Sequence, residues 1–226
     1  MKNSPIIFSA KMVQAILEGR KTQTRRLVRF SSEKSHSTLQ KAVLKGGFID
    51  FNLGSDFFQC PFGMRGYTLW VRETHAWVEN GEDSGWVYRA TDPDWETTDG
   101  WKWKPSIHMP KNASRITLKI NELRIERLQD IGISDAIAEG IQSFRPVPGD
   151  GAPETVYRDH TQKNRWVKSP IESFHTLWDS IHGPDSWGKN PWVWVISFGF
   201  ALPETPPEAP QHTAQEPTGP AAPLPS

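Results

Sequence analysis

The 226-residue chain has a single cysteine, no long hydrophobic run and no net charge. Cys60 cannot form an internal disulfide, and no second cysteine exists to complete the usual paired zinc ligands. The seven histidines lack an HExxH-like spacing, so we expect neither a metal nor a cofactor. No run of about 18 apolar residues is present, which excludes a membrane-spanning helix, and the apolar stretch after MKNS is too short for a signal peptide. We therefore expect a cytoplasmic protein with no membrane partner.

The charge balance excludes long-range attraction of a polyanion, because 26 basic residues face 26 acidic ones. Any nucleic-acid binding must then come from a local patch. One such patch lies between Glu18 and Glu33, where five basic residues occur without an acidic one: Arg20, Lys21, Arg25, Arg26 and Arg29. Its acid-free character favours contact with phosphate, and a solvated surface is the alternative. Of the eleven tryptophans, we expect most in the core and a minority as stacking surfaces.

Hydrophobic periodicity predicts short strands mixed with a few helices. A helix over Ala10–Glu18, capped by Ser9 and ended by Gly19, follows a strand at 5–9, so the basic segment should begin on the turn after the helix. Further helices are expected from a Ser134 cap to Gly140 and from Pro170 to Gly183. The remaining strands are predicted at 68–78, 85–90, 115–128 and 190–200. The last is apolar on both faces, which is typical of a central strand.

This pattern lacks regular βαβ alternation and favours an α+β domain. A β-barrel would let so many short strands avoid exposed edges. We expect one domain over residues 1–202, with flanking helices and with insertions near 31–66, 79–104 and 142–168. The last insertion is predicted to be an exposed loop. Residues 203–226 are rich in proline and alanine and are predicted to be disordered.

Five blocks together resemble the ASCH family, in the version common in phage and prophage proteins. They are IIFSAKMVQAILEGRKTQTRR (6–26), CPFGMRGYTLWVRET (60–74), PSIHMPKNASRI (105–116), LQDIGISDAIAEGI (128–141) and FHTLWDSIHGPDSWGKNPWVWVISF (174–198). The resemblance implies a PUA-like barrel with a cleft beside the first helix. It also implies binding of RNA or of a modified nucleoside. One branch, the bacterial N4-acetylcytidine amidohydrolases, shares a G-R-K-T-x-T-x-R segment and implies catalytic roles for Lys21, Thr24 and Glu139. Those enzymes are compact, whereas this chain carries three insertions.

Removal of an acyl group from an exocyclic amide needs a nucleophile, a base and donors for the oxyanion. Thr24 can supply the hydroxyl. Lys21 can act as the base only in its neutral form, which neighbouring arginines and burial would favour. Glu139 would then orient the lysine or handle the proton of the leaving amine. The alternative is an ordinary ion pair between Lys21 and Glu139, with Thr24 capping a turn.

Further binding candidates lie outside the basic segment. Arg72 and Glu73 are neighbours on one predicted strand, so one of them must point inward; we expect Arg72 to line the cleft, with a structural salt bridge as the alternative. His108 and Ser114 could contact a base edge or pack a loop, and Trp70 could stack on a base or belong to the core. The function favoured is an amidohydrolase acting on an acylated nucleoside. A non-catalytic RNA-binding module and a ribonuclease are the alternatives, although no paired histidines support the latter. No protein partner can be inferred.

Overall fold

A computed structural model describes residues 3–29, 43–45, 48–50, 57–79, 84–92, 102–145 and 155–201. The expected disordered tail lies outside these residues, as do parts of all three insertions. Within the described ranges no helix has the length and apolar character needed to cross a bilayer.

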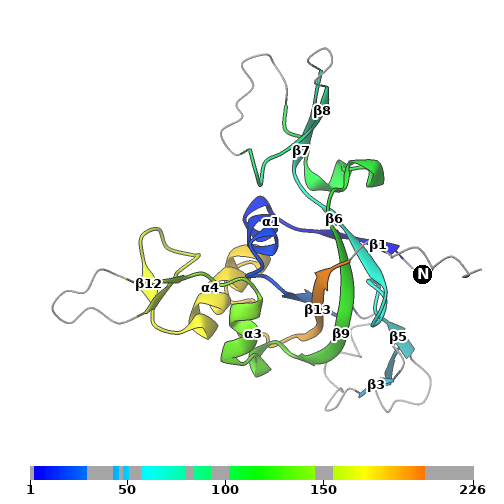
Figure 1. The fold of residues 1–226 in the computed structure, drawn as a ribbon. Coiled ribbons are helices and arrows are strands. Elements are labelled where there is room, and N and C mark those ends of the chain that lie inside the picture. Colours follow the sequence, from blue (N-terminus) through cyan, green and yellow to red (C-terminus); the bar gives the residue numbers. More distant parts are fainter. Residues whose placement is uncertain are drawn as a thin grey trace, which may run out of the picture.

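The described chain has the α+β character that the sequence predicted, and it is built on one mixed five-stranded sheet (Figure 1). Its strands occur in the order β1 (Asn3–Ile7), β6 (Thr68–Arg72), β9 (Thr117–Arg127), β13 (Trp192–Phe200) and β2 (Gln23–Leu27). The β1–β6 pair is parallel and the other pairs are antiparallel.

The described strands do not close into the predicted barrel, because β1 and β2 form the two edges of the sheet and share no backbone ladder. One side-chain hydrogen bond spans the opening instead: Arg26 Nη2 on β2 donates to the carbonyl of Ile7 on β1, at 2.6 Å. The connection between these strands is helix α1 (Ala10–Leu17). The sheet is thus open beside the first helix.

The helices begin and end close to the predicted positions. Ser9 caps α1 by accepting from Met12 N, and Gly19 follows the helix with φ of 72°. Helix α4 (Pro170–His182) is capped by Ser169 and ends at Gly183. The predicted Ser134 cap is wrong, because α3 (Ile133–Ala138) begins after Gly132 and Ser134 is already helical.

Strand β13 is central and buried on both faces, as expected. Trp194, Ile196 and Phe198 belong to a core formed with α1, β1 and β6. Val193 and Val195 point to the other face and pack with α3 and α4, which cover that side of the sheet (Figure 1). At roughly 25 cal/mol per Å² of apolar surface, burial on both faces makes this strand a large contributor to stability.

The insertions contain small sheets of their own. One antiparallel sheet contains β3 (Val43–Lys45), β4 (Phe48–Asp50) and β5 (Phe57–Gln59). A second pairs β7 (His75–Val78) with β8 (Gly85–Tyr88). A third contains β10 (Ser143–Phe144), β11 (Val156–Arg158) and β12 (Trp166–Val167). Short 3₁₀ helices span Ser106–His108, Lys111–Ala113 and Leu128–Asp130.

Two predictions about these segments are wrong. The single strand expected at 68–78 breaks into β6 and β7, because the backbone N–H of Glu73 bonds the Met109 sulfur instead of a strand. The expected loop at 142–168 contributes strands β10, β11 and β12 to a sheet that contacts α4.

Candidate functional site

The basic segment lies mostly on a strand rather than on the predicted turn. Residues Gln23–Leu27 form β2, which pairs with β13. Side chains alternate across a strand, so Thr24 and Arg26 lie on the face of the first core while Gln23 and Arg25 lie on the face covered by α3. The strand therefore divides the basic patch between two environments.

The structure brings Lys21 and Glu139 together although 118 positions separate them. The two residues form a β-bridge at the end of α3. The Lys21 ammonium nitrogen donates to Glu139 Oε2, to Glu139 O and to Gln23 O, each at 2.8 Å. Only 1% of the Lys21 side chain and 4% of the Glu139 side chain are exposed. All three donors of the ammonium group are therefore satisfied by protein acceptors.

Gly140 lets the end of α3 approach this lysine closely. Its φ is +91°, a conformation that glycine adopts without strain. A Cβ at this position would lie 3.0 Å from Lys21 Cβ and 3.2 Å from Ala15 Cβ. The glycine in the AIAEG segment thus places the carboxylate that precedes it against the lysine.

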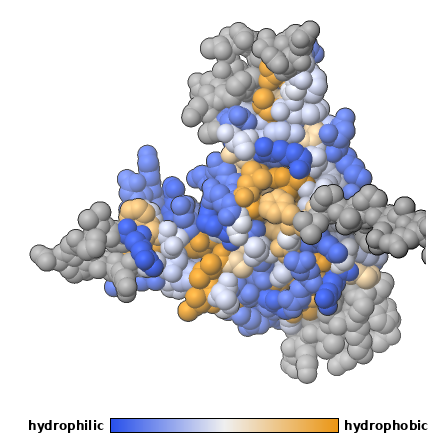
Figure 2. Space-filling view, viewed as in Figure 1, coloured by the Kyte–Doolittle hydropathy of each residue, from blue (hydrophilic) through white to orange (hydrophobic). Residues whose placement is uncertain are grey.

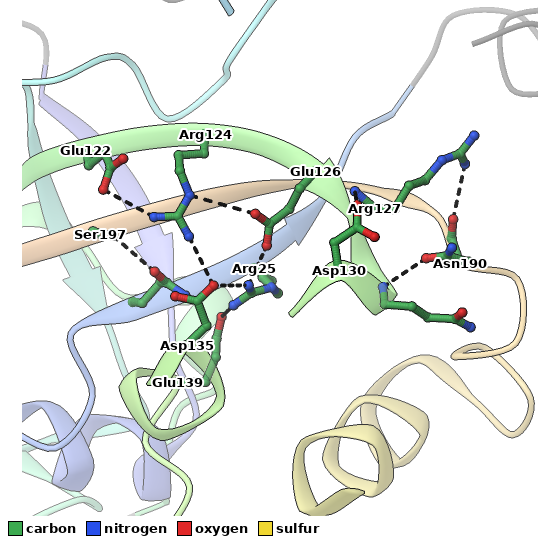
Figure 3. Close-up of polar contacts among 12 residues, drawn as sticks. Arg25, Glu122, Arg124, Glu126, Arg127, Asp130, Asp135, Glu139, Asn190 and Ser197 are labelled. Atoms are coloured by element: carbon green, nitrogen blue, oxygen red, sulfur yellow. Dashed lines mark hydrogen bonds and ion pairs between the residues drawn. The ribbon is translucent and has the colours of Figure 1, made fainter. Parts of the chain in front are cut away.

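Arg25 lies at the centre of an acidic cluster on the other face of β2 (Figure 3). Its guanidinium contacts Glu126 at 2.5 Å, Asp135 at 2.8 Å and Glu139 at 3.2 Å, and its side chain is fully buried. Arg124 on β9 contacts Asp135 at 3.1 Å and joins the same cluster. The acids missing from the local sequence are supplied by β9 and α3. They engage both terminal nitrogens of the Arg25 guanidinium, whereas its Nε has no acceptor among the described residues.

Burial is the main influence on the titration of the lysine. It lowers the pKa of Lys21 below its usual value, and the charges of Arg26 and Arg25 act in the same direction. The adjacent Glu139 carboxylate opposes this shift. Burial also raises the pKa of Asp135, but the hydrogen bond and charge of Arg25 outweigh it and leave that pKa below its usual value.

A cavity of about 500 Å³ opens beside α1, between the edge strands. This volume is within the range of small-molecule sites. Thr24 lines the cavity, whereas Lys21 lies behind it. The wall is formed by Ile7; by Ser9, Lys11, Met12 and Ala15 of the first helix and its cap; by Thr24, Arg25, Arg26 and Leu27; by Gly140, Ile141 and His160; and by Phe174, Leu177, Trp178, Ser180, Ile181 and His182 of α4.

The chain matches no protein-family model, curated protein or solved structure. Function must therefore be inferred from the groups around this cavity. Three of the lining side chains, Arg25, Arg26 and Trp178, carry buried N–H groups with no acceptor within the part of the chain that the structure describes. An unpaired buried donor costs about 1–3 kcal/mol, so an acceptor on a ligand would relieve a real penalty.

The other arginines of the basic segment differ in how far protein groups engage them. Arg20 pairs with Glu18 and donates to the Gly140 carbonyl at 3.2 Å. Arg26 lies over the Phe8 ring, 5.1 Å from its centroid, and lines the cavity while its Nη2 bonds Ile7 O. Arg26 is therefore the arginine of this segment best placed to meet a ligand in the cavity.

The remaining predicted binding residues lie apart from the cavity wall. Arg72 stacks over Trp70, 5.5 Å from the ring, and donates to the Ile107 carbonyl. Ser114 donates to the Val71 carbonyl at 2.8 Å, and His108 is exposed at the end of a 3₁₀ helix. None of these four predicted candidates belongs to the residues that line the cavity beside Thr24.

The inward residue of the Arg72–Glu73 pair is the glutamate. Glu73 is 1% exposed and accepts two hydrogen bonds from Arg115, at 2.9 and 3.0 Å. The two residues are not neighbours on one strand, as predicted, because β6 ends at Arg72. The buried charge is Glu73, and it is satisfied by a structural partner. The expectation that Arg72 lines the cleft is not met at this cavity.

Sequence reasoning missed two histidines that line the same cavity, His160 and His182. Burial lowers the pKa of His160, and the charges of Arg158 and Lys11 add to this effect. Burial and the charge of Arg26 likewise lower the pKa of His182. Both imidazoles are therefore neutral at pH 7. The two histidines come from separate segments, so no local spacing in the sequence could have shown that they line one cavity.

No cluster of three His, Cys, Asp or Glu side chains that could hold a metal occurs in the described ranges. A second cavity, of about 530 Å³, adjoins the first and shares Arg26, Leu27 and His182 with it. Arg29 and Phe62 also line this second space. The two cavities thus lie on either side of Arg26, Leu27 and His182.

Proposed function

We propose that this chain is an ASCH-type protein with a PUA-like core that removes an acyl group from a modified nucleoside such as N4-acetylcytidine. The observation that carries the proposal is the buried Lys21–Glu139 pair behind a cavity that Thr24 lines. The three residues implied by the family resemblance come from two distant segments. Their convergence beside one cavity large enough for a nucleoside supports the assignment.

The fold contributes independent support. The resemblance implies a cleft beside the first helix, and the 500 Å³ cavity lies against α1. The opening between β1 and β2 is spanned by a single arginine side chain. A PUA-like core opened at this edge would present its interior to a ligand at the cavity.

In the proposed reaction the Thr24 hydroxyl attacks the acetyl carbonyl carbon while neutral Lys21 takes its proton. The guanidinium of Arg26 stabilises the developing oxyanion. Collapse of the tetrahedral intermediate breaks the bond to the exocyclic nitrogen, which receives the proton and leaves as the free amine of cytidine. A water molecule then hydrolyses the acetyl ester on Thr24 and releases acetate.

Lys21 must change its hydrogen bonds for this step. Its three donors are occupied by two carbonyl groups and one carboxylate, an arrangement that favours the ammonium form. Burial favours the neutral form. In the substrate complex the amine exchanges its contact with Gln23 O for the Thr24 hydroxyl, and Glu139 keeps it oriented through the two remaining contacts.

The experiment is acetate release from a panel of acylated nucleosides and acylated RNA. Wild-type protein should release acetate, and Lys21→Met should abolish release while retaining its fold by circular dichroism. Lys119→Met is the matched control, because Lys119 is an exposed lysine on β9 that lines none of the cavities described above. Absence of release from every acylated substrate would remove the proposal.

Ribonuclease activity is a second candidate, and one observation favours it. His160 and His182 line one cavity, and both are neutral at pH 7, as a general base must be. Cleavage of unmodified RNA that is lost in His160→Gln and His182→Gln but kept in Thr24→Val would support this function over deacylation. If the protein binds RNA but catalyses neither reaction, the result would favour a non-catalytic RNA-binding module.

A further inference from the structure

The small sheet formed by β10, β11 and β12 carries a pair of exposed aromatic rings. Phe144 and Trp166 are 51% and 49% exposed, and their rings stack with centroids 5.1 Å apart and an interplanar angle of 29°. Stacked aromatic rings left half-exposed are unusual on a surface that has no partner, because each ring could bury more area.

These rings share one face of the sheet with a cation. Phe144 pairs with Val156 and Trp166 pairs with Arg158 across β11, and paired residues point to the same side. Tyr157 and Val167 point to the opposite side, where Tyr157 packs against the core near α4. Phe144, Arg158 and Trp166 are exposed on their face, and Val156 is the buried residue on it.

A cavity of about 310 Å³ lies between this face and α1. Its cationic lining comprises Lys11, Arg20 and Arg158, and no Asp or Glu is among its described lining residues. Arg20 is held by Glu18, whereas Lys11 and Arg158 are exposed and influence the same imidazole, His160. Figure 2 shows hydrophilic residues beside a smaller apolar area on this lobe, at the left of the view.

This cavity adjoins the Thr24 cavity. The two share Lys11, Gly140 and His160 in their walls. A chain leaving the Thr24 cavity past His160 would therefore meet two cations and then the aromatic pair. This order of groups is what a nucleotide neighbouring the modified one presents: a phosphate followed by a base.

We propose that the β10–β12 face is a subsite for a nucleotide adjacent to the modified one, so that the substrate is a single-stranded oligonucleotide rather than a free nucleoside. The base stacks on the Phe144–Trp166 pair, and Lys11 and Arg158 contact the intervening phosphate. This inference rests on the proposed function for the occupant of the Thr24 cavity, but the subsite itself can be tested by binding alone.

The test measures binding of short fluorescent single-stranded RNA and DNA oligonucleotides to the full chain, beside a mononucleoside and a duplex of the same sequence. Single strands should bind more tightly than the duplex, whose bases are already stacked. Trp166→Ala and Phe144→Ala should each weaken single-strand binding by about 5- to 100-fold, since stacking on an aromatic ring has that effect per base. Mononucleoside binding should not change.

Two matched controls separate the subsite from general surface effects. Phe200→Ala removes a ring that is 50% exposed at the end of β13 and should leave binding intact. Arg158→Gln should lower the salt slope of binding by about 0.7, the value expected for one lost phosphate contact, whereas Arg89→Gln at another exposed arginine should not. Comparison of RNA with DNA identifies which backbone the subsite accepts.

The outcomes distinguish this inference from the proposed function. Wild-type affinity in Trp166→Ala and Phe144→Ala, equal loss in Phe200→Ala, or failure of the wild type to bind any single strand overturns the subsite. Selective loss in the two aromatic variants supports it, even if no acetate is released. Acetate release from free nucleoside alone, with no oligonucleotide binding, would support the hydrolase and refute the subsite.

Discussion

Replacement of Lys21 by methionine tests the protonation state on which the proposed chemistry depends. Methionine keeps an unbranched apolar side chain and removes the titrating amine. Burial lowers the pKa of Lys21 in the folded protein, while the ordinary value of 10.5 applies to the unfolded chain. Between these two pKa values the unfolded chain binds one more proton at this residue than the folded protein does.

The sign and the size of the effect follow from proton linkage. The free energy of unfolding rises with pH wherever the unfolded state binds more protons. The Lys21 contribution therefore increases as pH rises through the folded pKa, by up to about 1.4 kcal/mol per pH unit, and becomes constant above 10.5. Below the folded pKa the residue is protonated in both states and adds no slope.

The assay is urea denaturation of wild type and Lys21→Met at several pH values from 7 to about 10, with unfolding monitored by tryptophan fluorescence. The difference in unfolding free energy between the two proteins should rise with pH in favour of the wild type. Other groups titrate in both proteins and cancel in this difference. Lys119→Met is the control, because it replaces an exposed lysine outside the cluster around Glu139.

A parallel pH dependence of wild type and Lys21→Met would refute the reasoning. It would mean that the Glu139 carboxylate and the two carbonyl acceptors outweigh burial, so that the amine keeps its proton throughout this range. Lys21 would then be a structural ammonium group and could not take a proton from Thr24.

Three further predictions concern the same cluster. Glu139→Gln leaves two buried cations with one carboxylate fewer and should lower the unfolding free energy by about 3–5 kcal/mol at pH 7, measured by urea denaturation. Gly140→Ala should lower the thermal midpoint of unfolding. The new Cβ would contact Lys21 and Ala15, and the backbone at position 140 has a left-handed conformation that alanine adopts with strain. Arg25→Lys should lower the urea midpoint, because a single ammonium group cannot span three carboxylates as the guanidinium does.

The fold was predictable wherever a local pattern decides the structure. Helix α1 begins after Ser9 and ends before Gly19, and α4 begins after Ser169 and ends before Gly183. These ends are predictable because caps and left-handed turns depend on only a few residues. The apolar residues on both faces of β13 predicted a strand that is covered on both sides. None of these features needs knowledge of the rest of the chain.

The long strand β9 shows how a correct element can hide an irregularity. Its apolar residues alternate as Ile116, Leu118 and Ile120 and then shift by one position to Leu123 and Ile125. The structure has a register shift in the pairing with β13 at this point, between Ser197 and Phe198. The change of phase marks a β-bulge, which keeps the apolar side chains on the buried face despite one extra residue.

The site was predictable only in part, because its charges come from distant segments. The resemblance placed Lys21 beside Glu139, and the structure brings them into contact. The acid-free basic patch was misleading, since Glu126 and Asp135 neutralise Arg25 from β9 and α3. A local sequence window cannot contain partners that lie more than a hundred positions away.

Acetate release by Thr24→Val compared with Thr22→Val tests the central claim most directly. Both changes replace a threonine hydroxyl by a methyl group within the same segment, but Thr24 is buried at the cavity and Thr22 is exposed. We expect Thr22→Val to deacetylate an N4-acetylcytidine-containing oligonucleotide at the wild-type rate and Thr24→Val to release no acetate above background. Equal rates in the two variants would contradict the account, because the attacking hydroxyl could not then belong to Thr24.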